Sequence, residues 1–238
     1  MPSAVVSHAC MNGNHLTTSV QGAFDPWPLL RKRGESGGAT ALRLVVHGRS
    51  GGLVPPCVRE ISVAVAESRA APVELEVLTA DVPTPAQCHS QWLVPLLLLP
   101  GSHARSDVPV IRDRLRSDGV VVKPLPFLGS WECWWVLMSR WIEVVVAQNR
   151  SLALVHHPLR PGLSDRFLIS VQRRFGLPVV AFDVWDQFAK NQPNMVPLPL
   201  SLAPNRMSEA LGQAGGLPSL LEVPELRQGL IDCLAALP

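Results

Sequence analysis

The chain has 238 residues, which at roughly 150 residues per domain allows one large domain or two small ones with a substantial core. Apolar residues make up 47% of the chain and charged residues only 17%, so the composition excludes disorder over most of the length. The formal net charge is +2, and the only basic run is Arg31, Lys32 and Arg33, which gives nucleic-acid binding little electrostatic support. We therefore expect a folded, core-rich protein without a nucleic-acid partner.

The cysteines and the apolar runs indicate the compartment. The five cysteines are an odd number, widely spaced and without a C-x-x-C pair, which argues against a disulfide framework and a zinc finger. The first 20 residues lack the charged start and apolar stretch of a signal peptide. The longest strongly apolar run, 93–100, is far below the ~20 residues that span a bilayer. We expect a cytoplasmic protein with no membrane partner.

The N-terminal 40 residues differ in pattern from the rest. Residues 1–40 are rich in Ser, Gly, Asn and Pro and show no sustained period of 2 or 3.6, which predicts a poorly ordered extension that the core does not need. Order begins at ALRLVV (41–46), an apolar run that predicts a short buried strand closed by the turn-prone GRSGG. In the following segment, 55–70, Val58, Ile61 and Val65 recur at helical spacing, which predicts a helix.

Strands and helices continue to alternate up to residue 147. VELEVLTA and WLVPLLLLPG predict two strands, and SHARSDVPVIRDRLRSDG predicts a helix that ends near Gly119. VVVKPLPF predicts a fourth strand, and SWECWWVLMSRWIEVVVAQN predicts a closing helix whose four tryptophans we interpret as core residues rather than a site for a flat aromatic ligand. This order is typical of a parallel sheet with crossover helices, so we predict a flavodoxin-like α/β domain over 41–147.

The remaining residues repeat this pattern. SLALVHHPLRPG resembles LRLVVHGRSGG, and MVPLPLSLAPNRMSEAL resembles LVPLLLLPGSHARSDVP, which aligns His156 with His47 and Asn205 with His103. SDRFLISVQRRFG and LPVVAFDVWD supply a helix and a strand between the two matches. We therefore predict a second, related α/β domain over 150–238. Because adjacent side chains on a strand point to opposite faces, we do not expect His156 and His157 to share a metal.

Two histidines follow predicted strands of the first half. His47 comes directly after the first strand, and His103 follows the third apolar run. Ligands bind at the carboxyl ends of strands in open α/β sheets, so we expect these imidazoles to meet at one edge of the sheet. Neutral imidazole binds divalent transition metals and titrates near neutral pH, so the pair is suited to holding a metal ion or passing protons.

Strand-HG-loop-helix, the later P-L-L-L-x-x-G-x-H-x-R-x-D-V-P and the two similar halves together resemble the sirohydrochlorin chelatases, the ATP-independent class II enzymes that insert Co²⁺ or Fe²⁺ into a tetrapyrrole. The resemblance is clearest over 42–116. It implies an α/β fold of two similar flavodoxin-like halves, each a parallel sheet flanked by helices, with the tetrapyrrole held between them. It also implies that His47 and His103 are the catalytic and metal-binding residues, in cobalamin or siroheme biosynthesis, and that the divalent metal is a substrate rather than a permanent cofactor.

The segment around His103 supplies further candidates. Gly101, Ser102 and Arg105 are candidates for substrate binding; Arg105 either meets a propionate or acetate of the tetrapyrrole or is a solvated surface arginine. Asp107 either orients His103 or interacts with the dipole of the helix that begins there.

The chain departs from the family where a glutamate normally follows the second strand. Here the sequence is LTADVP, with Thr79 and Val82 at the acidic places, and Asp81 is the nearby supporting carboxylate. The helix that normally precedes the third strand is shortened to PTPAQCHSQ. Two alternatives therefore stay open beside the chelatase: a non-catalytic tetrapyrrole- or metal-binding protein, and an interaction protein on a flavodoxin-like scaffold. We expect a monomer or a homodimer.

Overall fold

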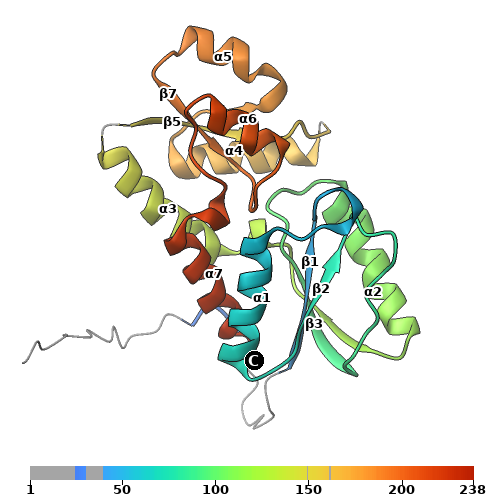
Figure 1. Ribbon diagram of the computed structural model, residues 1–238. Helices are drawn as coiled ribbons and strands as arrows, with labels where there is room; N and C mark the ends of the chain where they lie inside the picture. Colours follow the sequence, from blue (N-terminus) through green and yellow to red (C-terminus); the bar gives the residue numbers. More distant parts are fainter. Residues whose placement is uncertain (1–24, 31–39, 149, 161) are drawn as a thin grey trace, which may run out of the picture.

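The computed structural model describes residues 25–30, 40–148, 150–160 and 162–238, and these form an α/β fold with two all-parallel sheets (Figure 1). The first sheet has the order β2-β1-β3-β4, and the second has the order β6-β5-β7. The strands are β1 Ala41–Val46, β2 Val73–Val77, β3 Ser90–Pro95, β4 Val121–Pro124, β5 Ser151–His156, β6 Val179–Ala181 and β7 Met195–Pro199. The predicted fold class, two parallel α/β halves, is confirmed.

Seven α-helices flank the two sheets in the described part of the chain. They are α1 Pro56–Arg69, α2 Val108–Ser117, α3 Glu132–Ala147, α4 Leu163–Phe175, α5 Trp185–Asn191, α6 Arg206–Gln213 and α7 Pro224–Ala235. The sequence pattern predicted α1 to α4 and named no helix at the positions of α5, α6 and α7. None of the described helices combines the length and the apolar character that crossing a bilayer requires.

Both faces of the first sheet are covered, as its apolar strands require. β1 pairs in parallel with β2 on one side and with β3 on the other, and every one of its residues is buried. Leu42, Leu44 and Val46 face a large core that contains α1, whereas Val45 faces a smaller cluster formed with α2. The alternation of side chains along β1 therefore places one helix on each face.

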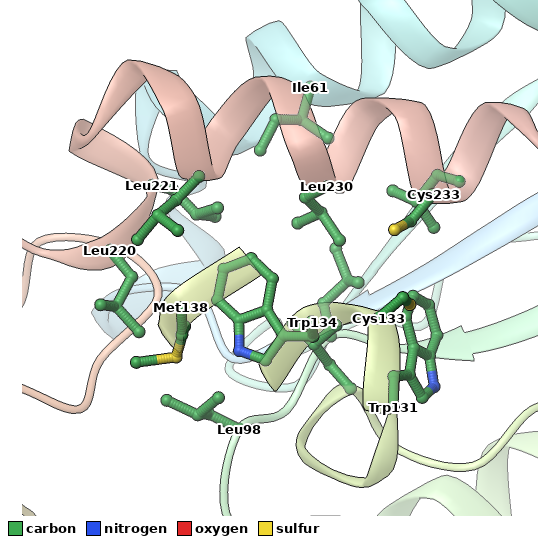
Figure 2. Close-up of a cluster of buried hydrophobic side chains, with 14 of the residues drawn as sticks. Ile61, Leu98, Trp131, Cys133, Trp134, Met138, Leu220, Leu221, Leu230 and Cys233 are labelled. Atoms are coloured by element: carbon green, nitrogen blue, oxygen red, sulfur yellow. The ribbon is translucent and has the colours of Figure 1, made fainter. Parts of the chain in front are cut away.

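The two halves share one hydrophobic core. Its buried side chains come from both sheets, from α1, from α3 and from α7, and they include Trp134, which is 1% exposed (Figure 2). α7 lies last in the sequence but packs against α1 and α3, beside the first sheet (Figure 1). Arg69, buried on α1, donates hydrogen bonds to the carbonyls of Leu234, Ala235 and Leu237 at the end of α7. The predicted boundary near residue 148 thus falls between two halves that are packed together.

The tryptophans of α3 confirm the core interpretation. Trp131, Trp134 and Trp135 are buried, and Trp141 packs against the same cluster while half-buried. The described cysteines, which are Cys57, Cys88, Cys133 and Cys233, are free thiols.

Part of the N-terminal extension packs against this core. Trp27 meets Trp131 edge to face with a ring-centroid distance of 4.7 Å, and its Nε1 donates a 2.7 Å hydrogen bond to the carbonyl of Cys233. The expectation that residues 1–40 pack poorly is therefore wrong for residues 25–30, because the ring of Trp27 packs against Trp131, which precedes α3, and its polar edge binds a carbonyl of α7. Residues 1–24 and 31–39, on which the same expectation fell, lie outside the described residues.

A buried ionic network lies under the connection between β2 and β3. Arg43 is fully buried on β1, and its guanidinium donates to Glu74 and Glu76 of β2 and to the side chain of Gln91. The same guanidinium donates to the backbone carbonyls of Thr84 (2.9 Å) and Pro85 (3.1 Å). Residues 78–89 contain no helix, as the shortened segment predicted, and Arg43 instead fixes this loop on the sheet.

Replacing Arg43 by Met should lower the free energy of unfolding by about 3–5 kcal/mol, because it leaves two buried carboxylates without their common partner. Urea unfolding followed by circular dichroism measures this loss. The control is Arg174→Met, which breaks an ion pair with Glu132 whose side chains are 34% and 65% exposed, and which should change the stability by no more than about 1 kcal/mol. Equal losses in the two variants would contradict a structural role for Arg43.

Candidate active site between the two sheets

His47 follows the last residue of β1 at the carboxyl end of the first sheet. The loop turns at once, because Gly48 has a positive φ of 76° and lies against β2 and the residues that follow it. A Cβ at Gly48 would stand 2.4 Å from Cγ1 of Val77 and 2.7 Å from Oγ1 of Thr79, so only glycine fits this turn. The sharp turn leaves the imidazole of His47 exposed at the edge of the sheet.

His103 begins a wide helical turn, His103–Asp107, that leads into α2. Its imidazole meets that of His47 with a centroid distance of 4.9 Å and an angle of 79° between the ring planes. The predicted meeting of these two histidines at one edge of the sheet is therefore confirmed. The side chain of His103 is 42% exposed, so a small molecule or an ion can reach the pair.

The hydrogen bonds of both imidazoles define their tautomers. Nδ1 of His47 lies 2.8 Å from the carbonyl oxygen of Gly48, and Nδ1 of His103 lies 2.5 Å from Oδ2 of Asp107. Because these oxygens accept hydrogen bonds, Nδ1 carries the proton in each ring, and Nε2 keeps a free lone pair. A histidine held in this way through Nδ1 is typical of a metal ligand, and a carboxylate partner also raises the basicity of the ring.

The separation of the two rings suits a shared ion. Two nitrogens that each lie ~2.1 Å from one metal ion are at most about 4.2 Å apart. The centroids of the two rings can lie farther apart than these nitrogens, because each centroid is set back from its nitrogen by the radius of the ring. Within the part of the chain that the structure describes, no group of three His, Cys, Asp or Glu side chains is arranged to hold a metal ion. The site thus offers two imidazole ligands and leaves the other coordination positions to water or substrate.

A cavity of about 690 Å³ lies beside the histidine pair. One wall comes from the residues that follow β1 and β3, and the other comes from the residues that follow β5 and β7. The carboxyl ends of both sheets therefore face the same space, where the second sheet stands over the loops of the first (Figure 1). The volume lies within the roughly 300–1,000 Å³ of small-molecule sites.

The second half contributes His157 to this cavity, not His156. The alignment of His156 with His47 is wrong by one residue, because Leu44 and Leu154 both face the shared core. Counting from these leucines makes His157 the counterpart of His47, whereas His156 is buried within β5. The hydrogen bonds to the next strand agree, since Leu96 donates to the carbonyl of Val45 and Leu200 to that of Val155.

The environment of His157 favours its neutral form. Burial lowers the pKa of His157, and the charges of His47 and His156 lower it further. Burial also lowers the pKa of His156, whose Nδ1 lies 2.7 Å from the carbonyl oxygen of His157. Neutral imidazole therefore faces the pair from the second half, at a position that sequence reasoning had left unused.

The structure places only some of the other predicted site residues at the cavity or at the histidine pair. Gly101 lines the cavity and Asp107 orients His103, whereas Ser102, Arg105 and Asp81 are exposed and do not line the cavity. Asn205 also lines it, where its side chain caps α6 by accepting a 2.9 Å hydrogen bond from the backbone nitrogen of Ser208.

Thr79 occupies the place of the missing glutamate and lies in the cavity wall. Its hydroxyl donates a 2.6 Å hydrogen bond to the backbone carbonyl of Arg49, in the loop that follows His47. The position at which the resemblance implies a carboxylate therefore carries a hydroxyl that holds this loop.

Sequence reasoning missed an ion pair that joins the two halves across the cavity. Nη2 of Arg49 lies 2.6 Å from Oε1 of Glu209, and the guanidinium also donates to the carbonyl of Pro204. The two side chains are 47% and 51% exposed, and pairs of this kind contribute about 0.2–1 kcal/mol. The position of Arg49 in HGRSGG, directly after the first strand, could have indicated a site residue. No sequence pattern indicated its partner Glu209, 160 residues away.

No family model and no curated protein matches this chain at the sequence level. Solved structures do match it. The sirohydrochlorin chelatase SirB from Bacillus subtilis subspecies spizizenii, in complex with cobalt, is 16% identical, covers 82% of this chain and 93% of its own, and gives a TM-score of 0.51. SirB from Bacillus subtilis with Fe³⁺ is also 16% identical, covers 82% and 94%, and gives 0.54.

CbiX, described as the terminal enzyme for biosynthesis of siroheme in denitrifying bacteria, is 18% identical, covers 82% of this chain and 97% of its own, and gives a TM-score of 0.58. At these identities the likeness establishes the fold. The chain therefore has the two-sheet α/β fold of these chelatases, which confirms the predicted resemblance at the level of architecture.

Replacing His47 by Ala should raise the pKa of His157, because it removes a nearby charge that disfavours protonation. The pKa should stay below the ordinary value, since burial remains the larger cause. Titration of the histidine ring protons by NMR measures both effects. His89→Ala serves as the control, because His89 is exposed at the opposite edge of the first sheet. An unchanged His157 titration would show that its ring does not face His47.

Proposed function

We propose that this protein inserts a divalent metal ion, Co²⁺ or Fe²⁺, into sirohydrochlorin or a related tetrapyrrole, a step of siroheme or cobalamin biosynthesis. The observation that carries this proposal is the His47–His103 pair, whose rings are 4.9 Å apart and whose Nε2 atoms are free. The cavity beside the pair and the chelatase fold support it.

The chemistry requires two events at the centre of the ring. Two pyrrole N–H protons must leave while a partly dehydrated ion enters, so the site needs a metal ligand and a proton acceptor close together. Two imidazoles that are bonded through Nδ1 and leave Nε2 available meet both needs. Asp107 binds Nδ1 of His103 and so turns Nε2 of that ring toward a metal ion or a proton. The metal and the tetrapyrrole are both substrates in this scheme.

The second candidate is a protein on the same fold that binds a tetrapyrrole or a metal without inserting one. Thr79 favours it, because the described residues then offer two imidazoles and no third His, Cys, Asp or Glu arranged to hold a metal ion with them; the carboxylate of Asp107 is bound to Nδ1 of His103. An anaerobic assay with sirohydrochlorin and each metal separates the two candidates. Both bind the free ring, but only an enzyme accelerates the appearance of the metallated absorption spectrum over the rate without protein.

Replacing either His47 or His103 by Ala should abolish metal insertion and leave ring binding and thermal stability nearly unchanged. Both side chains lie at the exposed edge of the sheet and contribute little to the core. Absorbance at the wavelengths of the metallated ring measures insertion, and a titration with metal-free ring measures binding. His89→Ala again serves as the matched control. Full activity in both alanine variants would refute the proposed mechanism.

Replacing Thr79 by Glu should raise the insertion rate, because it places a carboxylate in the cavity wall beside His47. The additional anionic ligand strengthens the hold on a divalent ion and helps to remove its water. Insertion rates measured at several metal concentrations distinguish tighter metal binding from faster insertion of the bound metal. Thr79→Gln is the control, because glutamine has the same length as glutamate and carries no charge. An unchanged rate together with a strongly impaired Asp81→Ala would mean that Asp81 supplies the carboxylate.

A further inference from the structure

We propose that Arg49 recognises an acidic edge of the substrate, and that Glu209 holds the Arg49 guanidinium across the cavity until a substrate carboxylate takes its place. This inference rests on the proposed function, since it names how the same cavity selects a ring that carries carboxylate side chains.

The position of Arg49 suits this role. It is two residues from His47, and both residues line the cavity. A ring whose carboxylate binds Arg49 therefore lies in the same cavity as the histidine pair. The planar guanidinium binds a carboxylate through two parallel hydrogen bonds, which fixes the orientation of the ring as well as its presence.

The charges at the cavity favour an acidic ligand. The charged side chains that line it in the described part of the chain are Arg49, Arg206 and Glu209, which leaves one positive charge in excess. Arg206 is exposed and makes no ion pair with any residue that the structure describes. Glu209 lies on α6, three residues after Arg206, and its carboxylate binds the Arg49 guanidinium where the carboxylate of a ligand could bind instead.

The Arg49–Glu209 pair is suited to an exchange of Glu209 for a substrate carboxylate and is not needed to hold the halves together. Both side chains are about half exposed, so water weakens their attraction, and the shared core already joins the two sheets. The backbone of Arg49 is held independently, by the hydroxyl of Thr79 at its carbonyl and by the carbonyl of Leu53 at its nitrogen, 2.7 Å away. The guanidinium can therefore change partners while the loop that carries His47 stays in place.

Titration of the full-length chain with metal-free sirohydrochlorin under anaerobic conditions tests the proposal. Arg49→Gln should raise the Kd roughly tenfold, because it removes a charged hydrogen-bond donor and leaves Glu209 to repel the ring. Glu209→Gln should lower the Kd, because it frees Arg49 and removes the competing carboxylate. The double variant should bind more tightly than Arg49→Gln, because the repelling carboxylate is gone, and more weakly than Glu209→Gln, which keeps the guanidinium.

Opposite signs distinguish this role from a merely structural brace, which would make both single variants bind more weakly. The controls are Arg227→Gln and Glu60→Gln, which break a 2.7 Å ion pair between α7 and α1 outside the cavity and should leave the Kd unchanged. Thermal melting verifies that every variant is folded. Shifts of the same sign, or shifts no larger than the controls, would overturn the role of Arg49 while leaving the chelatase proposal intact. Failure of the unmodified chain to bind the ring would overturn both.

Discussion

Burial of side chains between the two sheets is the constraint on which the site depends. The core around Trp134 takes its residues from both sheets and from α1, α3 and α7. Each large apolar side chain in it contributes about 1.5–3 kcal/mol by leaving water, whereas an exposed ion pair across the cavity contributes no more than about 1 kcal/mol. The relative position of the halves is thus a property of the core, and the cavity keeps its shape whether or not the Arg49–Glu209 pair is formed.

The shared core also explains why the chemistry lies where it does. Because the strands of each sheet are parallel, the loops at their carboxyl ends gather at one edge, and the two edges face one another across the cavity. The turn at Gly48 then aims His47 at His103. From the other side, the turn after β5 brings His157 into the same space. His47, His103 and His157 therefore line one cavity between the two sheets.

Much of this arrangement could be predicted from the sequence, and the failures have physical reasons. Apolar runs closed by turn residues located the strands of both halves, and the parallel rhythm correctly brought His47 and His103 together. Matching the two halves by sequence aligned His156 with His47, because such a match ignores which face of a strand is buried. A one-residue shift exchanges the two faces, so the structure moves that role to His157.

Two other features could not be reached in the same way. The helix α7 was missed because its apolar positions are buried only by packing against α1 and α3, which are distant in the sequence. The burial of Arg43 was missed because ALRLVV was interpreted by its apolar residues alone. The alternation in VELEV nevertheless carried a signal, since it places Glu74 and Glu76 on one face of the strand next to Arg43.

The departure at Thr79 connects these features to the function. Where the resemblance to the chelatases implies a glutamate, this chain carries a hydroxyl that binds the backbone of the Arg49 loop, and the following connection is fixed by Arg43 rather than by a helix. The exchange removes a negative charge from the cavity wall, and the lining charges then sum to one positive. Such a cavity attracts a bare divalent cation less strongly than an acidic one would, and it attracts an acidic ring more strongly. Under the proposed function, the loop at Thr79 would therefore favour binding of the acidic ring over binding of the metal ion.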